Sequence, residues 1–583
     1  MKLITFIKNY FPNIKTSKYQ GIYFPTKIDL PQKDDLNSIL AWPPNVFIIA
    51  HAIIEYTDKY RLLVSPQDHF IWTEQDRALV KSISESWNNF ISYILNKNNT
   101  SRFFDLELYR ALENVFKKSN LNKSVYDLIN ERDFSKGLFL LFLSVDELFS
   151  DTGISNKHHG GELGSYLIIR DIVISMSKGK KVRNGNISHI EQPQNLADNQ
   201  DKYGFVTYKS SVPQSGLTIN NMSHNIACIK PSVKPVVRVA SGNNKSKNYN
   251  VLILPWPMTI EPDSFMAVSP ESNDIEMDPY FGFFNYTPDK EPSPKNFLSA
   301  VLSAIRRCGS IDLIVLPECS INNETYEKFK KILYFCFKER APSLLAGVYG
   351  RDGECSSNVA RLAFLSETGK YFSFEQSKHH RWFLDKNQLR NYNLSSSLDP
   401  NKKWWENIRI GRRQLSSLHT KNGVKLCPLI CEDLARQEPV AQAVRAIGPN
   451  LVISLLLDGP QLSQRWPGKY SAVLSDDPGT SVLSVTALGM TLRSTGSGDK
   501  PHRGVALWSE PSNGSKTLSL DEGAIGMVLE LELKKEPMWT IDGRAKEKVI
   551  LRRMYDSSIM PFHNEYTYRK IRKILKNELK KGA

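Results

Sequence analysis

The sequence contains few cysteines for its length, 7 in 583 residues. Their number is odd, and no two of them form a Cys-x-x-Cys pair. Disulfide frameworks and structural zinc sites need paired cysteines at regular spacings, so this pattern argues against both. We therefore expect a reduced protein with a cytoplasmic location. The seven are Cys228, Cys308, Cys319, Cys336, Cys355, Cys427 and Cys431.

Long apolar runs are also missing. No stretch of about 18 apolar residues occurs, so no membrane span is expected. The densest run, Leu138–Leu143, is short and is soon followed by acidic residues. The N-terminus, Met1–Lys8, begins like a signal peptide, but Pro12 follows before a full apolar region develops and no small-residue cleavage site comes after it. The sequence therefore predicts neither a membrane span nor a secretory leader.

A metal site is not expected either. His158 and His159 are adjacent, so their side chains would point in different directions on a helix or a strand. A metal pair would need an i,i+4 spacing or a third ligand.

The net charge of +15 is concentrated in part in two basic runs, Lys178–Arg183 and Arg569–Leu579. The second run has apolar residues at helical spacing between its lysines and arginines. Two interpretations stay open. The C-terminal stretch is either a peripheral helix with one solvated basic face or a surface for nucleic acid or anionic membrane.

The length predicts two or three domains. Helical periodicity predicts a mostly α-helical N-terminal domain over residues 1–183, for which the sequence indicates no role. Residues 184–247 are polar and turn-rich and are expected to form a linker with a short strand pair near Tyr203–Tyr208. Strands and helices then alternate over 248–555, which predicts a layered α/β domain, and 556–583 are expected to form a basic C-terminal helix.

Three strand-like runs of this α/β domain end in residues that can carry chemistry. Ile311–Pro317 leads to Glu318, Tyr371–Phe374 leads to Lys378, and Leu426–Ile430 leads to Cys431. Ligands of open α/β sheets collect beyond the carboxyl ends of the strands. A carboxylate, an amine and a thiol brought together there make a candidate nucleophile site. A helix N-terminus after Cys431 would favour its thiolate form.

Glu318, Lys378 and Cys431, in this order and context, resemble the Glu-Lys-Cys triad of the nitrilase-like carbon–nitrogen hydrolase superfamily. The resemblance extends over roughly residues 248–555 and includes strand-like segments at Asn250–Leu254, Leu451–Leu455, Thr480–Thr486, Gly504–Trp508 and Ala524–Leu531. It implies a four-layer αββα sandwich, an α/β fold preceded here by the helical domain. It also implies a cytoplasmic homo-oligomer that needs no cofactor.

The same resemblance assigns roles to the residues. Cys431 would attack an amide, carbamoyl or nitrile carbon, and Glu318 would accept the thiol proton. Lys378 would stabilise the oxyanion together with the backbone N–H of Glu432. The family often has a second glutamate, for which Glu406 and Asp385 compete, with Glu406 preferred. Cys319 and Cys427 are interpreted as packing residues, since alternation along a strand turns Cys319 away from Glu318.

The segment from Arg381 to Arg413 is expected to be a long inserted loop. It carries eight basic residues, so it is either a solvated loop or a lid that favours an anionic substrate or a polyanionic partner. The basic residues are Arg381, Lys386, Arg390, Lys402, Lys403, Arg409, Arg412 and Arg413.

Two functions from different classes remain. The first is a cysteine-dependent amidase or nitrilase that acts on a small molecule. The alternative is a nitrilase-fold binding or scaffold protein, with nucleic acid as a partner and a role in prokaryotic antiviral defence. The chain has no Tyr-x-Asp-Asp polymerase motif and no Ser-Gly-Gly phosphate loop. These absences argue against a fused reverse transcriptase and a glutamine-dependent NAD synthetase, respectively.

Overall fold

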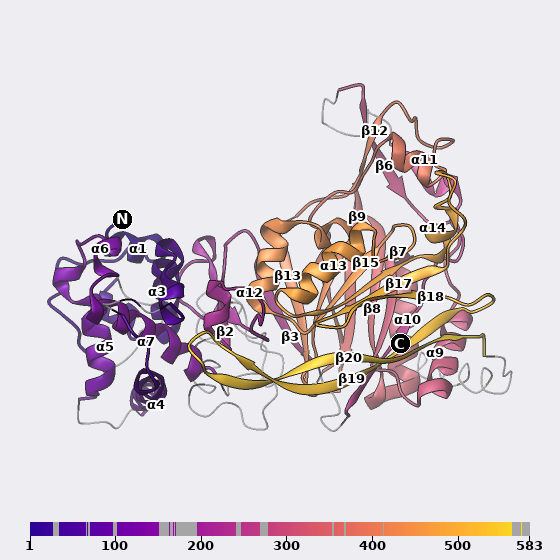
Figure 1. The fold of residues 1–583 in the computed structure, drawn as a ribbon. Coiled ribbons are helices and arrows are strands. Elements are labelled where there is room, and N and C mark those ends of the chain that lie inside the picture. Colours follow the sequence, from indigo (N-terminus) through magenta and orange to yellow (C-terminus); the bar gives the residue numbers. More distant parts are fainter. Residues whose placement is uncertain are drawn as a thin grey trace. The chain divides into compact units, whose positions relative to one another are not determined.

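The computed structural model describes residues 1–26, 34–65, 67, 70–96, 102–150, 163, 167, 170, 195–240, 246–268, 278–352, 355–366, 369–411, 413–562, 569 and 573 (Figure 1). His158–Glu162, Lys178–Arg183, Arg412 and, apart from Arg569 and Lys573, residues 563–583 lie outside this set. The chain forms two compact units. The first comprises Met1–Arg238, Gln442–Pro449 and Glu536–Lys548, and the second comprises Val239–Ala441, Asn450–Lys535 and Val549–Ala583.

Helices dominate the first unit, as the periodicity predicted. Helix α7 (Arg132–Leu148) contacts α3, α4 and α5, and its run Leu138–Leu143 is buried throughout. Full burial of an aliphatic or aromatic side chain contributes about 1.5–3 kcal/mol, so this run is a main source of stability for the unit. The other helices are α1 (Leu3–Tyr10), α2 (Leu36–Leu40), α3 (Pro43–Thr57), α4 (Glu74–Leu95), α5 (Leu106–Phe116), α6 (Val125–Leu128) and α12 (Gln442–Ile447).

Residues 195–238, which the sequence analysis placed in a polar linker, belong to the first unit. Strands β1 (Phe205–Tyr208) and β2 (Ile226–Ile229) pair antiparallel there, with Phe205 opposite Ile229. Val206 and Ile226 are buried in the same hydrophobic core as the helices. The polar composition hid this pattern because a few apolar side chains among many turn residues are enough to pack two short strands.

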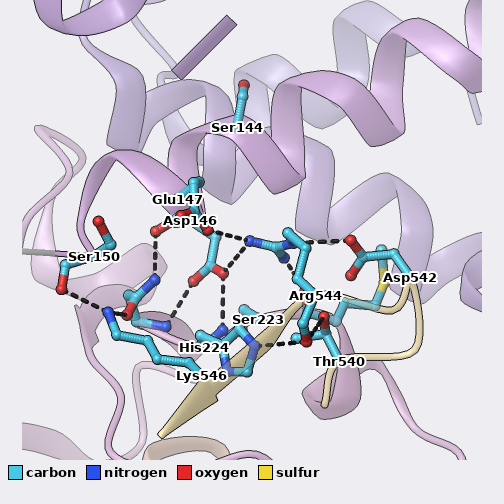
Figure 2. Close-up of polar contacts among 12 residues, drawn as sticks. Ser144, Asp146, Glu147, Ser150, Ser223, His224, Thr540, Asp542, Arg544 and Lys546 are labelled. Carbon is cyan, nitrogen blue, oxygen red and sulfur yellow. Dashed lines mark hydrogen bonds and ion pairs between the residues drawn. The ribbon is translucent and has the colours of Figure 1, made fainter. Parts of the chain in front are cut away.

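A buried polar network ties three separate segments of the first unit together (Figure 2). At the end of α7, the Asp146 carboxylate accepts the backbone N–H of His224 at 2.8 Å and Nη1 of Arg544 at 3.1 Å. Arg544 also donates from Nε to Asp542 at 2.8 Å, and its carbonyl lies 3.0 Å from Nε2 of His224. Buried charges of this kind persist only when they are paired, so the network fixes the segment from Asp542 to Arg544 against α7.

The second unit is built on two seven-stranded sheets. The first has the order β10-β9-β8-β7-β4-β19-β20 and the second β18-β17-β16-β15-β14-β13-β3. Strands β4, β7 and β8 are parallel, as are β14, β15 and β16. The bounds in the first sheet are β10 (Tyr371–Ser377), β9 (Cys355–Leu365), β8 (Ser343–Asp352), β7 (Leu313–Asn322), β4 (Asn248–Ile253), β19 (Gly526–Trp539) and β20 (Ala545–Ile559). Those in the second are β18 (Gly514–Ser519), β17 (Gly504–Glu510), β16 (Ser481–Thr486), β15 (Leu451–Leu456), β14 (Lys425–Ile430), β13 (Gln414–Thr420) and β3 (Lys234–Ala240).

Side-chain alternation along the strands creates the layers. Val251 and Ile253 of β4 pack in the core between the two sheets, whereas Leu252 packs on the outer side with Phe297 of α9 (Pro294–Cys308). Helix α10 (Asn323–Phe337) joins α9 over this face, and α13 (Trp466–Asp476) contacts β16 and β17 of the second sheet. The α/β sandwich with helices outside paired sheets, predicted from the sequence, is confirmed.

A third, four-stranded sheet differs from the expected loop over 381–413. Its order is β11-β12-β6-β5, and it lies with α11 at one end of the second unit (top of Figure 1). Trp404 packs in its core beside Phe284, which explains why this basic segment is ordered. The elements are β5 (Phe265–Ala267), β6 (Phe281–Tyr286), β11 (Phe383–Leu384), α11 (Lys386–Asn391) and β12 (Lys403–Glu406). The remaining helix is α14 (Leu488–Arg493).

Candidate active site

Glu318 is aimed into the second unit by an irregularity in β7. The pairing of β7 with β8 shifts register between Leu316 and Ile321, and Cys319 has a positive φ of 50°. A bulge of this kind redirects a side chain that regular alternation would place elsewhere. Gly347 of β8 permits it, because a Cβ there would lie 2.3 Å from the Pro317 carbonyl oxygen and 2.4 Å from Glu318 Cα.

Lys378 directly follows β10 and is held from both sides. Two residues earlier, Gln376 Nε2 donates to the Pro428 carbonyl of β14 at 2.6 Å, which bridges the two sheets. One residue later, the backbone N–H of His379 donates to both Asp433 oxygens at 3.1 Å. Both of these hydrogen-bonded partners, Pro428 and Asp433, are close to Cys431 in the sequence. Lys378 and Cys431 are therefore fixed relative to each other although they are far apart in the sequence.

Cys431 lies at a sharp turn. Strand β14 ends at Ile430, the 3-10 turn η9 begins at Cys431 and runs to Leu434, and the φ of Cys431 is 46°. A left-handed conformation costs a non-glycine residue about 1–2 kcal/mol and is found where the surrounding structure compensates for it, often at active sites. The N–H of Glu432 is among the first of the turn, and such groups have no acceptor within a helix.

Lys378 joins two glutamates in a fully buried ionic cluster. Its ammonium group donates to Glu318 Oε1 at 2.7 Å and to Glu406 Oε2 at 2.6 Å. Nδ2 of Asn358 donates to both glutamates, at 2.7 Å in each case. Glu406 also accepts the Trp382 N–H at 3.1 Å, whereas Oε2 of Glu318 has no hydrogen-bond partner among the described residues. Glu318 therefore keeps one oxygen for a further proton.

Burial controls the protonation of this cluster. It raises the pKa of Glu318 above its ordinary value, Glu406 raises it further, and Lys378 and Asn358 oppose the rise. Burial alone would lower the pKa of Lys378, but Glu318, Glu406 and Cys431 together raise it well above its usual value, so the ammonium form persists.

The thiol of Cys431 differs from the expectation based on a helix N-terminus. Burial raises the pKa of this thiol well above its usual range, and Glu318 raises it further, while Lys378 lowers it. The turn that begins at Cys431 is only four residues long, and Cys431 itself is buried, so burial outweighs any dipole stabilisation of a thiolate. The resting side chain is a neutral thiol, and it becomes a nucleophile only if a neighbouring base takes its proton.

Lys378 contacts Glu318 and Glu406, and Cys431 lies close enough for the charges of Glu318 and Lys378 to act on its thiol, but Asp385 does not join this group. Asp385 instead caps the N-terminus of α11, accepting the N–H of Gln388 at 2.9 Å. Cys319 and Cys427 are buried, and burial raises the pKa of both thiols. Within the part of the chain described here, no three His, Cys, Asp or Glu side chains are grouped to hold a metal ion. No helix among those residues is long and apolar enough to cross a membrane.

Sequence reasoning missed Asn358, Asp433 and Asp458. Asn358 lies within β9, where nothing in the sequence separates it from other polar strand residues. Asp433 accepts hydrogen bonds from His379 and from Nδ1 of His380, at 2.9 Å in the second case. Asp458 follows the end of β15, so the strand-end rule that selected Glu318 could have found it.

The sequence matches no family model and no curated protein. Solved structures that resemble part of the chain are members of the nitrilase superfamily, and none of them assigns the helical N-terminal unit. Nit3 from Saccharomyces cerevisiae, a member of branch 10 of the superfamily, is 15% identical with a TM-score of 0.31, and the match covers 50% of this chain and 93% of Nit3. XC1258 from Xanthomonas campestris, a CN-hydrolase superfamily protein, is 13% identical with a TM-score of 0.25 and coverages of 56% and 95%. The C. elegans NitFhit protein is 14% identical with a TM-score of 0.28 and coverages of 57% and 65%.

Proposed function

We propose that the second unit is a cysteine-dependent hydrolase of a non-peptide C–N bond in a small molecule. Cys431 is the nucleophile, Glu318 the general base and acid, and Lys378 the oxyanion partner, aided by the Glu432 N–H. Glu406 holds Lys378 in place. The protein works in the cytoplasm as a homo-oligomer and uses no cofactor.

The observation that carries this proposal is the buried Lys378 ammonium shared by Glu318 and Glu406 beside a thiol. Removing an ion from water costs several kcal/mol, and buried ion pairs rarely exceed the stability of apolar packing. Stability alone is therefore a poor explanation for three charges in one core. A base with a raised pKa, a fixed cation and a thiol are the groups that nucleophilic acyl transfer requires.

The reaction follows from these positions. The Cys431 sulfur bonds to the substrate carbonyl carbon while Glu318 takes the thiol proton, and the oxyanion is stabilised by Lys378 and the Glu432 N–H. Glu318 then protonates the departing nitrogen as the C–N bond breaks, which leaves a thioester. Water attacks the thioester, gives its proton to Glu318, and releases the acid and the free thiol.

A substrate screen with matched variants tests the proposal. The purified chain is incubated with small amides, carbamoyl compounds and nitriles, and the ammonia or amine released is measured. Cys431→Ala, Glu318→Gln and Lys378→Met should abolish any release while circular dichroism and the melting temperature stay close to wild type. Cys427→Ala, in the strand that leads to Cys431, is the control and should keep its activity.

The scaffold alternative gives the opposite result. If Cys431→Ala retains the full cellular effect of the protein while remaining folded, the catalytic proposal is wrong, and the ionic cluster serves only the fold. A screen in which wild type and Cys431→Ala release equal ammonia from every compound also contradicts the proposal.

A further inference from the structure

Asp458 lies beside the proposed nucleophile but has no part in the steps above. Strands β14 and β15 are parallel, with Ile430 opposite Leu455. Cys431 follows the first and Asp458 follows the second, so both lie beyond the same edge of the sheet, where adjacent strands are about 4.8 Å apart. The turn that begins at Cys431 contacts β15 and α13. The charge of Asp458 acts on the Cys431 thiol.

The carboxylate of Asp458 is buried and held by one of its oxygens. Oδ1 accepts a hydrogen bond from the Tyr392 hydroxyl and another from Nη2 of Arg465 at 3.0 Å. Oδ2 finds no donor among the described residues, although the side chain is only 4% exposed. A buried carboxylate oxygen without a donor is costly, and such a group in a native structure calls for an explanation.

The protonation of the neighbours fixes the direction of these hydrogen bonds. Burial and the Asp458 charge both raise the pKa of Tyr392, so the phenol keeps its proton and donates it. Burial would lower the pKa of Arg465, but Asp458 and Tyr392 raise it, so the guanidinium is charged. Oδ1 thus accepts hydrogen bonds from two donors, and Oδ2 is an acceptor to which none of the described residues donates.

We propose that Oδ2 of Asp458 accepts a hydrogen bond from an N–H of the substrate, which makes the substrate an amide or carbamoyl compound rather than a nitrile. This inference rests on the proposed hydrolase function. A nitrile nitrogen carries a lone pair and no proton, so it would leave Oδ2 without a donor and face its negative charge. Sites built for an N–H reject analogues that lack one, because the buried polar group stays unpaired.

Two small alkylating reagents of matched shape test this pairing. Iodoacetamide offers an amide N–H, and iodoacetonitrile offers only an acceptor nitrogen. In each reaction the sulfur bonds to the CH₂ carbon, the C–I bond breaks, iodide leaves, and the thiol proton passes to Glu318. The alkylation rate of Cys431 is followed by peptide mass spectrometry and divided by the rate of glutathione with the same reagent.

In the wild type, Cys431 should prefer iodoacetamide by about tenfold after this normalisation, the effect of one unpaired buried group. Asp458→Asn should reverse the preference. Tyr392 and Arg465 require an acceptor at Oδ1, so the amide oxygen must stay there and the NH₂ group must replace Oδ2. The site then offers a donor, which suits the nitrile. Asp556→Asn, on β20, is the control and should keep the wild-type preference.

The outcomes separate the two proposals. A reactive Cys431 with no wild-type preference, or an unchanged preference in folded Asp458→Asn, overturns the role of Asp458 and leaves the hydrolase proposal intact. If Asp458→Asn does not fold, the wild-type ratio decides. A Cys431 that reacts no faster than Cys427 with either reagent overturns the hydrolase proposal and this inference with it.

Discussion

The ammonium nitrogen of Lys378 lies 2.6 Å from Oε2 of Glu406, a residue that arrives from a separate small sheet. The same lysine lies 2.7 Å from Glu318, so one cation is shared by two carboxylates. The two acids are not equivalent, because both oxygens of Glu406 are occupied while Oε2 of Glu318 has no partner among the described residues. In the proposed mechanism, this difference suits Glu318 to proton transfer and Glu406 to positioning Lys378.

Removing the nucleophile should separate chemistry from folding. Cys431→Ala should reduce turnover by about 10⁴-fold or more, since the loss of a nucleophile from a catalytic set has effects of this size. Alanine meets the same backbone strain as cysteine at the Cys431 φ of 46°, so this strain does not add to the cost of the substitution. The variant is expected to lose no more than about 1–2 kcal/mol of folding stability. Ammonia release and urea denaturation measure the two effects. A Cys427→Ala protein that loses as much activity would contradict the assignment.

Two neighbours of Glu318 should shift its titration in opposite directions. Glu406 raises the pKa of Glu318. In Glu406→Gln, the acidic limb of the curve of Cys431 alkylation rate against pH should therefore move to lower pH. The Asn358 amide lowers that pKa, so Asn358→Leu should move the same limb to higher pH. The limb appears because Glu318 can accept the thiol proton only when it is ionised. The measurement is the iodoacetamide rate against pH, and parallel shifts in both variants would refute the base role of Glu318.

The bulge that carries Glu318 should not tolerate a side chain on β8. Gly347→Ala would place a Cβ 2.3 Å from the Pro317 carbonyl oxygen, so the Glu318 turn must move. We expect a loss of about 1–3 kcal/mol in folding stability together with a large fall in Cys431 reactivity. Gly350→Ala, on the same strand, meets only Ser357 Oγ at 3.2 Å and is the control. Equal effects of the two substitutions would argue against a special role for the bulge.

The first unit should lose stability in mild acid. Burial, opposed by the Asp146 charge, lowers the pKa of His224 from 6.5 to about 4. The imidazole is therefore neutral in the folded protein and gains a proton on unfolding below pH 6.5. Stability falls as the pH drops from about 6.5 to about 4, by roughly 3 kcal/mol for this shift.

His224→Gln should remove this part of the acid sensitivity, because glutamine does not titrate. The readout is hydrogen exchange of α7 peptides in both proteins at pH 7 and pH 4.5, where the difference between them reports the His224 contribution. Burial also lowers the pKa of His419 in the second unit, so that unit should keep its own acid sensitivity in the variant. An unchanged pH dependence of α7 exchange would contradict the prediction.

The order of the strands and helices in the α/β domain and the three residues at strand ends could be predicted from the amino-acid sequence. Apolar runs such as Ile311–Leu316 and Leu426–Ile430 predict buried strands because both sheet faces are covered, and a reactive residue placed directly after a strand lies at the sheet edge. The layered α/β domain followed from the alternation of strands and helices, and the sandwich arrangement followed from the family resemblance.

The surroundings of those residues depend on how segments distant in the sequence pack together. The choice between Glu406 and Asp385 depended on the small sheet, whose packing on Trp404 brings Glu406 to Lys378 and leaves Asp385 as a helix cap. Asn358 donates a hydrogen bond to Glu318, which is 40 residues away in the sequence. Asp458 accepts one from Tyr392, which is 66 residues away. Hydrogen bonds over such separations have no local period, since they arise where strands distant in sequence meet in space. The raised pKa of the Cys431 thiol has the same origin, because burial is a property of the packed sandwich and not of the turn that carries the residue.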